Sequence, residues 1–97
     1  ILSDIQQVIE KLKAINNNIQ LYFLEITPVA LRIDRNNAVI RELNVFLKEN
    51  LKSARWIALD SIFSDHYGKL NLDYTNDGLH LNEQGYQLLE EIIKSEL

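Results

Sequence analysis

The 97-residue sequence contains no cysteine and no methionine, and only one proline and three glycines. Without cysteine the chain can form neither a disulfide framework nor a thiolate metal site, which fits a reducing compartment such as the cytoplasm without requiring one. No hydrophobic run approaches the roughly 18 residues of a membrane-spanning helix, so we expect no transmembrane segment. The start of the chain, Ile1 to Asp4, has neither the basic region nor the cleavage site of a signal peptide.

The sequence also lacks a basic cluster. Ten lysines and arginines stand against fourteen aspartates and glutamates, which gives a net charge of -4 spread along the chain. We therefore expect neither nucleic acid nor a phosphate-rich membrane surface as a partner. A hydrophobic content of 46% is enough for a core, and the length allows at most one domain.

Hydrophobic periodicity predicts three helices and two strands. The segment from Ile19 to Ile26 is almost continuously apolar, which is typical of a strand buried on both faces of a parallel sheet. The order strand, helix, strand then predicts a parallel βαβ unit. Two parallel strands alone leave an open edge, so we expect a missing N-terminal half of the domain, or a second copy of the chain, to supply more strands. We expect helices at about 1–15, 36–50 and 83–96 and strands at about 19–26 and 54–60.

The helix starts carry recognisable caps. Asn36 or Asp34 can cap the middle helix, and Asn82 can cap the last one. Gly85 lies in the first turn of that last helix, where glycine costs up to about 1 kcal/mol against alanine. We therefore expect close backbone packing at Gly85.

The segment from Asp77 to Tyr86 places a carboxylate, an imidazole and a helix start within ten residues. Asp77 and His80 are three positions apart, and Gly78 between them allows a sharp turn, so the carboxylate can reach one ring nitrogen of the imidazole. An imidazole held in one tautomer is what a general base requires, and the Asp stabilises the imidazolium after proton uptake. The alternative is a surface turn in which Asp77 only caps the backbone.

Two further sets of residues are weaker candidates. Glu25 and Thr27 lie at the carboxyl end of the first strand, where the ligand crevice of an open α/β sheet lies; alternatively Glu25 is hydrogen-bonded at the rim. Asp65 and His66 are adjacent and could suggest a metal-ligand pair, although no further ligands are spaced nearby. A metal site would then be built on Asp65, His66, Asp77 and His80.

Asp77-Gly78-Leu79-His80-Leu81-Asn82 followed by Gly85-Tyr86 resembles the last conserved block of the SGNH (GDSL-type) hydrolases, whose triad Asp and His are three residues apart. Three upstream segments resemble the end of the fourth strand, the next helix and the fifth strand of that family: Ile26-Thr27-Pro28-Val29, residues 36–44 and residues 56–60. The resemblance covers almost the whole chain but only the second half of the family's domain. The family's Gly-Asp-Ser and Gly-x-Asn-Asp motifs are absent, and no serine of the chain stands in such a setting.

The resemblance implies an α/β fold, with residues 1–97 as a single partial domain: the C-terminal portion of a flavodoxin-like three-layer sandwich with parallel strands. It also implies a serine esterase or acylhydrolase that works through an acyl-enzyme on a small-molecule, carbohydrate or lipid ester. His80 would be the base and Asp77 its orienting partner, while the nucleophile would come from outside the chain, which alone would be inactive. No metal or organic cofactor follows. The competing hypothesis is a non-catalytic flavodoxin-like interaction module in which Asp77 and His80 only cap a turn.

Overall fold

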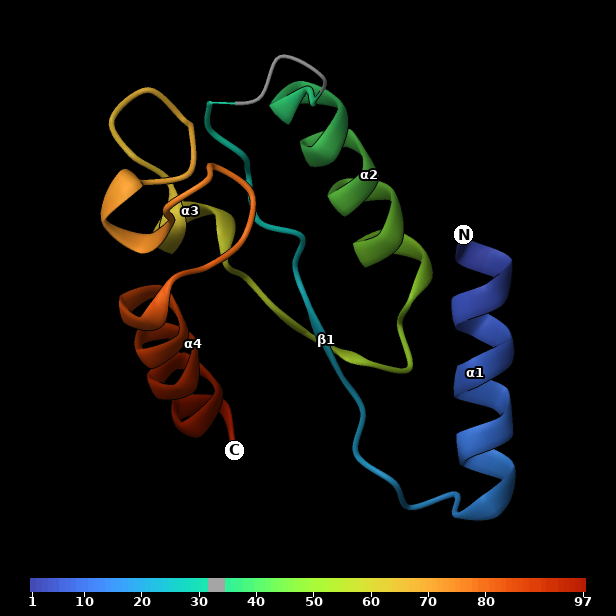
Figure 1. Ribbon diagram of the computed structural model, residues 1–97. Helices are drawn as coiled ribbons and strands as arrows, with labels where there is room; N and C mark the ends of the chain where they lie inside the picture. The colour runs from blue at the N-terminus through green and yellow to red at the C-terminus, as the bar shows by residue number, and fades with distance from the viewer. Residues whose placement is uncertain (32–34) are drawn as a thin grey trace.

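The computed structural model describes residues 1–31 and 35–97 (Figure 1). The three long helices lie where the hydrophobic periodicity predicted them, and two short helical segments were not expected. The helices are α1 (Leu2–Ile15), α2 (Asn37–Asn50), α3 (Asp60–Phe63) and α4 (Glu83–Glu96), the strands are β1 (Tyr22–Leu24) and β2 (Arg55–Ile57), and the 3-10 helix is η1 (Leu72–Tyr74).

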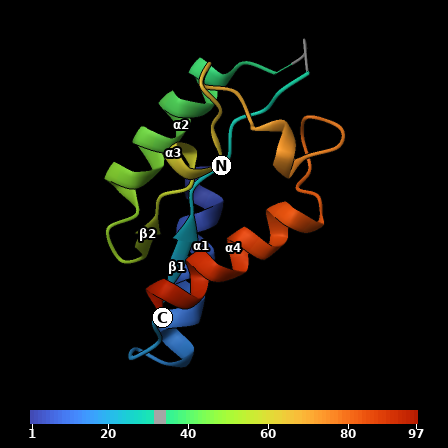
Figure 2. The same cartoon turned by 90° about the vertical axis from the view of Figure 1, so that its left-hand side faces the viewer.

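The two strands form a small parallel sheet in which Tyr22 lies opposite Arg55 and Leu24 opposite Ile57. The predicted parallel βαβ unit is thus confirmed. Figures 1 and 2 show α4 on one side of the strands and α1 and α2 on the other. The described part of the chain is therefore mixed α/β with a two-stranded parallel sheet, an arrangement compatible with a flavodoxin-like fold.

Strand β1 ends before the predicted Ile26, because the backbone beyond Glu25 pairs with side chains of α2 rather than with β2. The amide of Asn44 accepts from the N–H of Ile26 at 3.0 Å and donates to its carbonyl oxygen at 2.8 Å. Asn37 does the same at Val29, with distances of 2.7 and 2.8 Å. Each asparagine thus satisfies both backbone groups of one residue, and α2 holds the segment that leads from β1 towards the site.

Strand β2 also ends early, because Asp60, predicted as a strand residue, begins α3. The carboxylate of Glu25 accepts the N–H groups of Leu59 and Asp60 at 3.1 and 2.7 Å, and it also accepts from the indole Nε1 of Trp56 at 3.1 Å. This carboxylate satisfies free donors at the start of the helix, which is how acidic groups commonly stabilise helix N-termini.

The core lies between the sheet, α4 and the connection that follows α3. Its buried residues pack with partly buried side chains from β1, η1 and α4. The buried members are Ala30, Ile57, Leu59, Phe63 and Leu70, and the partly buried ones are Tyr22, Tyr74, Leu81, Leu88, Leu89 and Ile92.

The expectation that the segment from Ile19 to Ile26 is buried on both faces is wrong for this chain. None of these residues is buried, and Leu24 retains 38% of its surface exposed. The physical reason is that the described residues supply β1 with one neighbouring strand, so its other edge and part of its surface stay open. Helix α1 likewise buries none of its residues.

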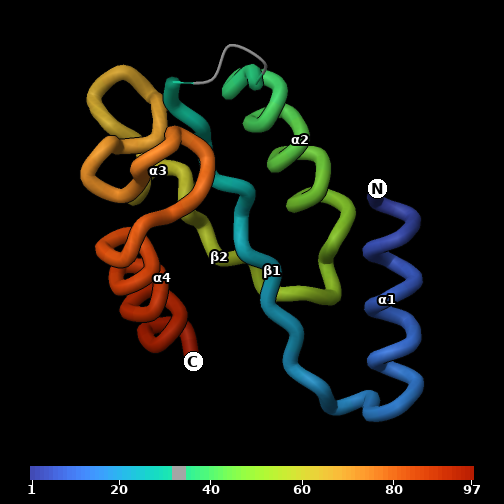
Figure 3. The backbone as a smooth tube through the Cα atoms, viewed as in Figure 1, coloured from blue at the N-terminus to red at the C-terminus, as the bar shows by residue number. Residues whose placement is uncertain are grey.

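The connection between α3 and α4 is more ordered than its polar composition suggested. Isolated antiparallel bridges join Ser64 to Leu70 and Thr75 to Leu81, so the chain makes two closed excursions, visible in the tube of Figure 3. The first excursion turns at Gly68, as predicted. The second, residues 75–81, carries Asp77 and His80 and is called the dyad loop below.

Helices long and apolar enough to cross a membrane are absent from the part of the chain that the structure describes.

Candidate functional site

Gly78 fixes the course of the dyad loop. Its φ is +84°, in the left-handed region that only glycine adopts without strain. A Cβ atom built on Gly78 would lie 1.8 Å from the carbonyl oxygen of Ala30, and the N–H of Ala30 donates to the carbonyl oxygen of Gly78 at 2.7 Å. The loop therefore lies directly against the segment that follows β1, and the sharp turn expected at Gly78 is present.

The two carboxylate oxygens of Asp77 have separate partners. Oδ1 accepts the backbone N–H groups of Leu79 and His80, both at 2.8 Å, and so caps the turn. Oδ2 lies 2.7 Å from Nδ1 of the His80 imidazole. Asp77 thus performs both roles that the sequence allowed: one carboxylate oxygen caps the turn, and the other orients the His80 imidazole.

The electrostatics follow from these contacts. The hydrogen bond from the His80 side chain, together with the N–H groups of His80 and Leu79, holds the pKa of Asp77 well below its ordinary value. The carboxylate is therefore charged at neutral pH, and a charged acceptor at Nδ1 favours the tautomer with its proton on Nδ1. Nε2 is then the free basic nitrogen of a side chain that is 74% exposed.

The start of α4 lies directly beyond the loop. Asn82 is its N-cap, accepting from the N–H of Gly85 at 2.9 Å, as predicted. Its amide nitrogen also donates to the carbonyl oxygen of Asp73 at 3.1 Å. The close packing expected at Gly85 is confirmed, because a Cβ atom there would lie 2.6 Å from the carbonyl oxygen of Tyr74. The helix and η1 thus brace the loop from its C-terminal side.

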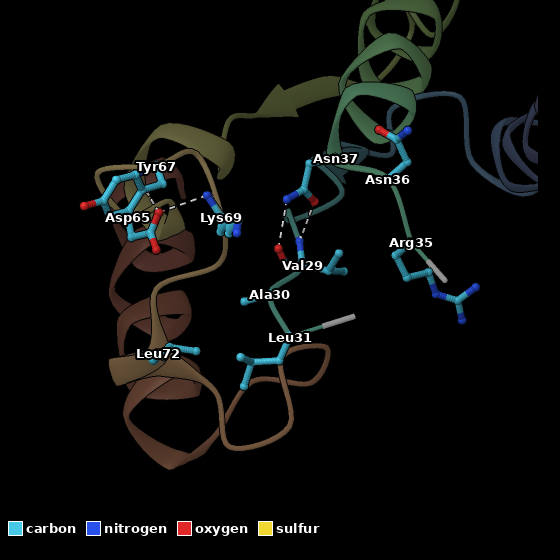
Figure 4. Close-up of a pocket in the computed structure, with 10 residues that line it drawn as sticks. All are labelled: Val29, Ala30, Leu31, Arg35, Asn36, Asn37, Asp65, Tyr67, Lys69 and Leu72. Carbon is cyan, nitrogen blue, oxygen red and sulfur yellow. Dashed lines mark hydrogen bonds between the residues drawn. The ribbon is translucent and has the colours of Figure 1, made fainter. Parts of the chain in front are cut away.

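A cavity of about 730 Å³ adjoins this loop through Ala30 (Figure 4). In Figure 4 the Asn37 amide and the Val29 backbone lie between two walls, one bearing Tyr67 and Lys69 and the other Arg35. We call this cavity the Val29 pocket. Its lining residues are Val29, Ala30, Leu31, Arg35, Asn36, Asn37, Asp65, Tyr67, Lys69 and Leu72.

The polar wall of the Val29 pocket is a tight turn. The carboxylate of Asp65 accepts the N–H groups of Tyr67 and Lys69 at 2.8 and 3.0 Å, and these backbone bonds hold its pKa below the usual range. Arg41 anchors the same turn by donating to the carbonyl oxygen of Gly68. Asp65 is therefore a charged carboxylate at this wall, and the cationic side chains that line the pocket are those of Arg35 and Lys69.

The weaker candidates do not join the Asp77–His80 pair. Glu25 accepts three hydrogen bonds, two at the start of α3 and one from Trp56 of β2, which corresponds to the structural alternative for this residue. His66 packs edge-on against Tyr67 at a ring-centroid distance of 5.4 Å. Among residues 1–31 and 35–97, no three His, Cys, Asp or Glu residues are grouped so that they could hold a metal ion, so the metal site on Asp65, His66, Asp77 and His80 has no structural support.

Sequence reasoning overlooked two residues that shape the site. Asn37 holds the pocket wall at Val29, and Thr75 places its hydroxyl inside the dyad loop. The signal for Thr75 was a hydroxyl residue two positions before Asp77, a spacing common in turns. The partner of Asn37 is eight residues away across a loop, and no local pattern predicts such a contact.

No family model matches the chain, but known proteins resemble it both in sequence and in structure. The solved structure of a Streptococcus pneumonia protein, provisionally described as a platelet activating factor, matches with a TM-score of 0.89 at 26% identity, over 98% of this chain and 49% of that one. N-acylneuraminate cytidylyltransferase of Escherichia coli O18:K1:H7 (strain RS218 / NMEC) is 43% identical over 94 residues, covering 93% of this chain. The match spans 22% of that relative, so this chain corresponds to about a fifth of its length.

This relative corrects the functional predictions made from the SGNH resemblance. The predicted family, the serine esterase or acylhydrolase activity and the hydrolase class are wrong, because the similar protein is named as a cytidylyltransferase. An esterase forms an acyl-enzyme at a carbonyl carbon, whereas cytidylyl transfer is substitution at phosphorus. The Asp77-x-x-His80 block predicts a carboxylate–imidazole pair but does not specify the electrophile that the pair serves. The alternative of a non-catalytic module gains no specific support from the relative either.

Proposed function

We propose that this chain is the sugar-binding part of an enzyme related to N-acylneuraminate cytidylyltransferase, and that His80 is a proton acceptor in it. The observation that carries this proposal is the 2.7 Å contact between Asp77 Oδ2 and His80 Nδ1 in a largely exposed side chain. Such a pair combines a fixed tautomer with an accessible second nitrogen, which suits proton transfer from a hydroxyl group. The substrate class comes from the name of the 43% identical relative.

In cytidylyl transfer a sugar hydroxyl oxygen bonds to the phosphorus of the cytidylyl group while the bond from that phosphorus to the nucleotide's leaving group breaks. In our proposal Nε2 of His80 accepts the hydroxyl proton, and Asp77 stabilises the resulting imidazolium. The three glycines of the chain, at 68, 78 and 85, form no phosphate-binding glycine motif. We therefore assign nucleotide binding to the parts of the enzyme that this chain does not contain.

The Val29 pocket is the proposed sugar site. Its volume of about 730 Å³ suits a small ligand. An N-acylneuraminate is a carboxylate with an N-acyl group, and the pocket offers matching chemistry: cationic Arg35 and Lys69, and apolar Leu31 and Leu72. The hydrogen bond between Ala30 and Gly78 joins the pocket wall to the dyad loop.

We also propose that residues 1–97 are the C-terminal half of a larger flavodoxin-like three-layer domain. The match to 49% of a longer solved chain and the open edge of β1 support this assignment. Because Arg55 donates to Leu21 and Glu25 donates to Ile57, the alternate residues Tyr22 and Leu24 direct their backbone groups away from β2. In this proposal a parallel strand from the rest of the domain pairs with that edge.

The test uses the full-length protein with cytidine triphosphate and N-acetylneuraminate, and measures pyrophosphate release. We expect His80→Gln to lower kcat about 10²- to 10⁴-fold, the usual contribution of a general base. His66→Gln is the matched control, since His66 contacts Tyr67 and lies outside the dyad loop. An unchanged rate for His80→Gln would reject the proton-transfer role and favour the turn-cap alternative.

The sugar site is tested separately with Lys69→Met, which removes the charge and keeps the length of the side chain. We expect the KM for N-acetylneuraminate to rise about tenfold, the loss of one charge-assisted hydrogen bond, while the KM for the nucleotide is unchanged. Lys48→Met, on α2 and outside the Val29 pocket, is the control. Equal KM values for N-acetylneuraminate in wild type and Lys69→Met would reject the Val29 pocket as the sugar site.

A further inference from the structure

Thr75 is buried, with only 4% of its surface exposed, at the residue where η1 leads into the dyad loop. Its hydroxyl donates to the carbonyl oxygen of His80 at 2.6 Å and accepts from the N–H of Gly78 at 3.0 Å. The same oxygen is 3.4 Å from Asp77 Oδ1, at the limit of a hydrogen bond. A hydroxyl has one proton, and the short contact to His80 takes it.

These contacts place one buried oxygen at the centre of the loop. The bridge between Thr75 and Leu81 closes the loop at its base, and the hydroxyl then ties Gly78 and His80 to the same point. Gly78 is buried, so loss of the hydroxyl would leave its N–H without the partner it has now.

We propose that Thr75 is a positioning residue for the Asp77–His80 pair, and this inference rests on the function proposed for His80. The pair depends on the backbone on both sides of Leu79, because Asp77 Oδ1 caps the turn there while Oδ2 reaches the imidazole. By fixing Gly78 before this turn and His80 after it, the Thr75 hydroxyl sets the distance from Oδ2 to Nδ1. Thr75 itself acts through the loop and is assigned no contact with substrate.

A merely structural role for Thr75 makes a different prediction. A buried hydroxyl that only satisfies loop polar groups would, on removal, lower the melting temperature and leave the His80 ring environment unchanged in the folded protein. A positioning role changes the imidazole itself, because a shift of the loop weakens the bond at Nδ1. A displacement near 1 Å in a catalytic group can cost about 10²-fold in rate.

The experiment compares Thr75→Val, which keeps the shape and removes the hydroxyl, with Thr75→Ser, which keeps the hydroxyl. Nitrogen-15 and proton NMR of the histidine-labelled protein reports the tautomer of His80, with His80→Gln assigning the signal. We expect wild type and Thr75→Ser to show a hydrogen-bonded Nδ1 proton. We expect Thr75→Val to lose this signal, to populate the Nε2-protonated tautomer and to lower kcat about 10²-fold at unchanged KM.

Ser64→Ala is the matched control, because it also removes a hydrogen-bonded hydroxyl, the one that donates to Asp60 at 2.6 Å. It should change the melting temperature and leave the His80 signal as in wild type. A Thr75→Val protein that is folded and keeps the Nδ1 proton signal would overturn the inference.

If Thr75→Val does not fold, amide hydrogen exchange in the wild type tests whether the N–H of Gly78 is bonded to the Thr75 hydroxyl. Slow exchange at Gly78 supports the bond to the Thr75 hydroxyl, and exchange as fast as at an exposed loop amide rejects it. These outcomes can be distinguished from failure of the proposed function. If the wild type does not catalyse cytidylyl transfer, but its Nδ1 proton signal is present and is lost in Thr75→Val, the positioning role of Thr75 stands and only the proposed reaction is rejected.

Discussion

The side-chain amide of Asn37 pairs with both backbone groups of Val29, at 2.7 Å to the N–H and 2.8 Å to the carbonyl oxygen. The pair makes the first turn of α2 part of the wall of the Val29 pocket. Ala30 follows Val29 and bonds to Gly78, so this one contact connects α2 with the dyad loop.

Asn37→Ala should therefore destabilise the protein by about 1–3 kcal/mol, because the N–H of Val29 loses its partner, while the carbonyl oxygen of Val29 loses one donor and keeps the N–H of Leu70 at 3.3 Å. The free energy of unfolding in urea measures the effect. Asn50→Ala is the matched control on the same helix, since its amide donates to the carbonyl oxygen of Phe46 at an exposed position. We expect a change below about 0.5 kcal/mol there. Equal losses of unfolding free energy in Asn37→Ala and Asn50→Ala would contradict a stabilising role for the Asn37–Val29 pair.

Gly78→Ala should lower the free energy of unfolding by about 3 kcal/mol or more. The new Cβ atom would combine a φ of +84° with a distance of only 1.8 Å to the backbone oxygen of Ala30. Gly68→Ala is the control, because its φ is also positive, at +76°, while its nearest neighbour is the flexible end of Arg41 at 3.4 Å. We expect a loss of about 1 kcal/mol for Gly68→Ala, and thermal unfolding separates the two cases. A similar loss in both would mean that backbone conformation alone sets the cost at Gly78.

The pKa of Asp77 is lowered in the folded protein, chiefly by its bond to the His80 side chain, and this makes stability depend on pH. The unfolded state then binds more protons than the folded state just below the ordinary aspartate pKa of about 3.9, so stability rises with pH in that window. The contribution is complete above about pH 5 and is lost as the pH falls through the lowered pKa of the folded state.

Asp77→Asn should flatten this part of the stability profile, measured by urea unfolding between about pH 2 and pH 6. Asp73→Asn, an exposed aspartate on η1, is the control and should leave the slope as in wild type. A wild-type slope in Asp77→Asn would assign the acid sensitivity to other carboxylates.

The open edge of β1 should drive self-association when residues 1–97 are prepared without a partner strand. Leu24→Lys places a charge on this edge, and edge charges oppose strand pairing. We expect light scattering after size-exclusion chromatography to show a smaller average mass for Leu24→Lys than for wild type. Val45→Lys, which adds the same charge at an exposed position of α2, should match wild type. A wild-type chain that stays monomeric at all concentrations would reject this prediction.

Local signals in the sequence were sufficient for part of this structure. The long helices were predictable because their apolar spacing and the caps at Asn36 and Asn82 act over a few residues. The Asp77–His80 contact was predictable for the same reason, since the two residues are three positions apart with Gly78 between them.

Contacts between distant segments were not predictable from local pattern. The strand expected over 19–26 ends at Leu24 because Asn44, from the next helix, takes both backbone groups of Ile26 that a strand would use. The strand expected to include Asp60 ended earlier because Glu25, far away in the sequence, caps α3. The chemistry was mispredicted because a carboxylate–imidazole pair is compatible with more than one electrophile.

The Asn37–Val29 and Asn44–Ile26 contacts restrict how the length of α2 can change. Asn37 and Asn44 lie two helical turns apart and therefore on one face. Inserting or deleting a single residue between them rotates one asparagine relative to the other by about 100°. The helix could then form its contact with Ile26 or its contact with Val29, but not both. We therefore expect insertions and deletions after Asn44 to be tolerated better than those between Asn37 and Asn44.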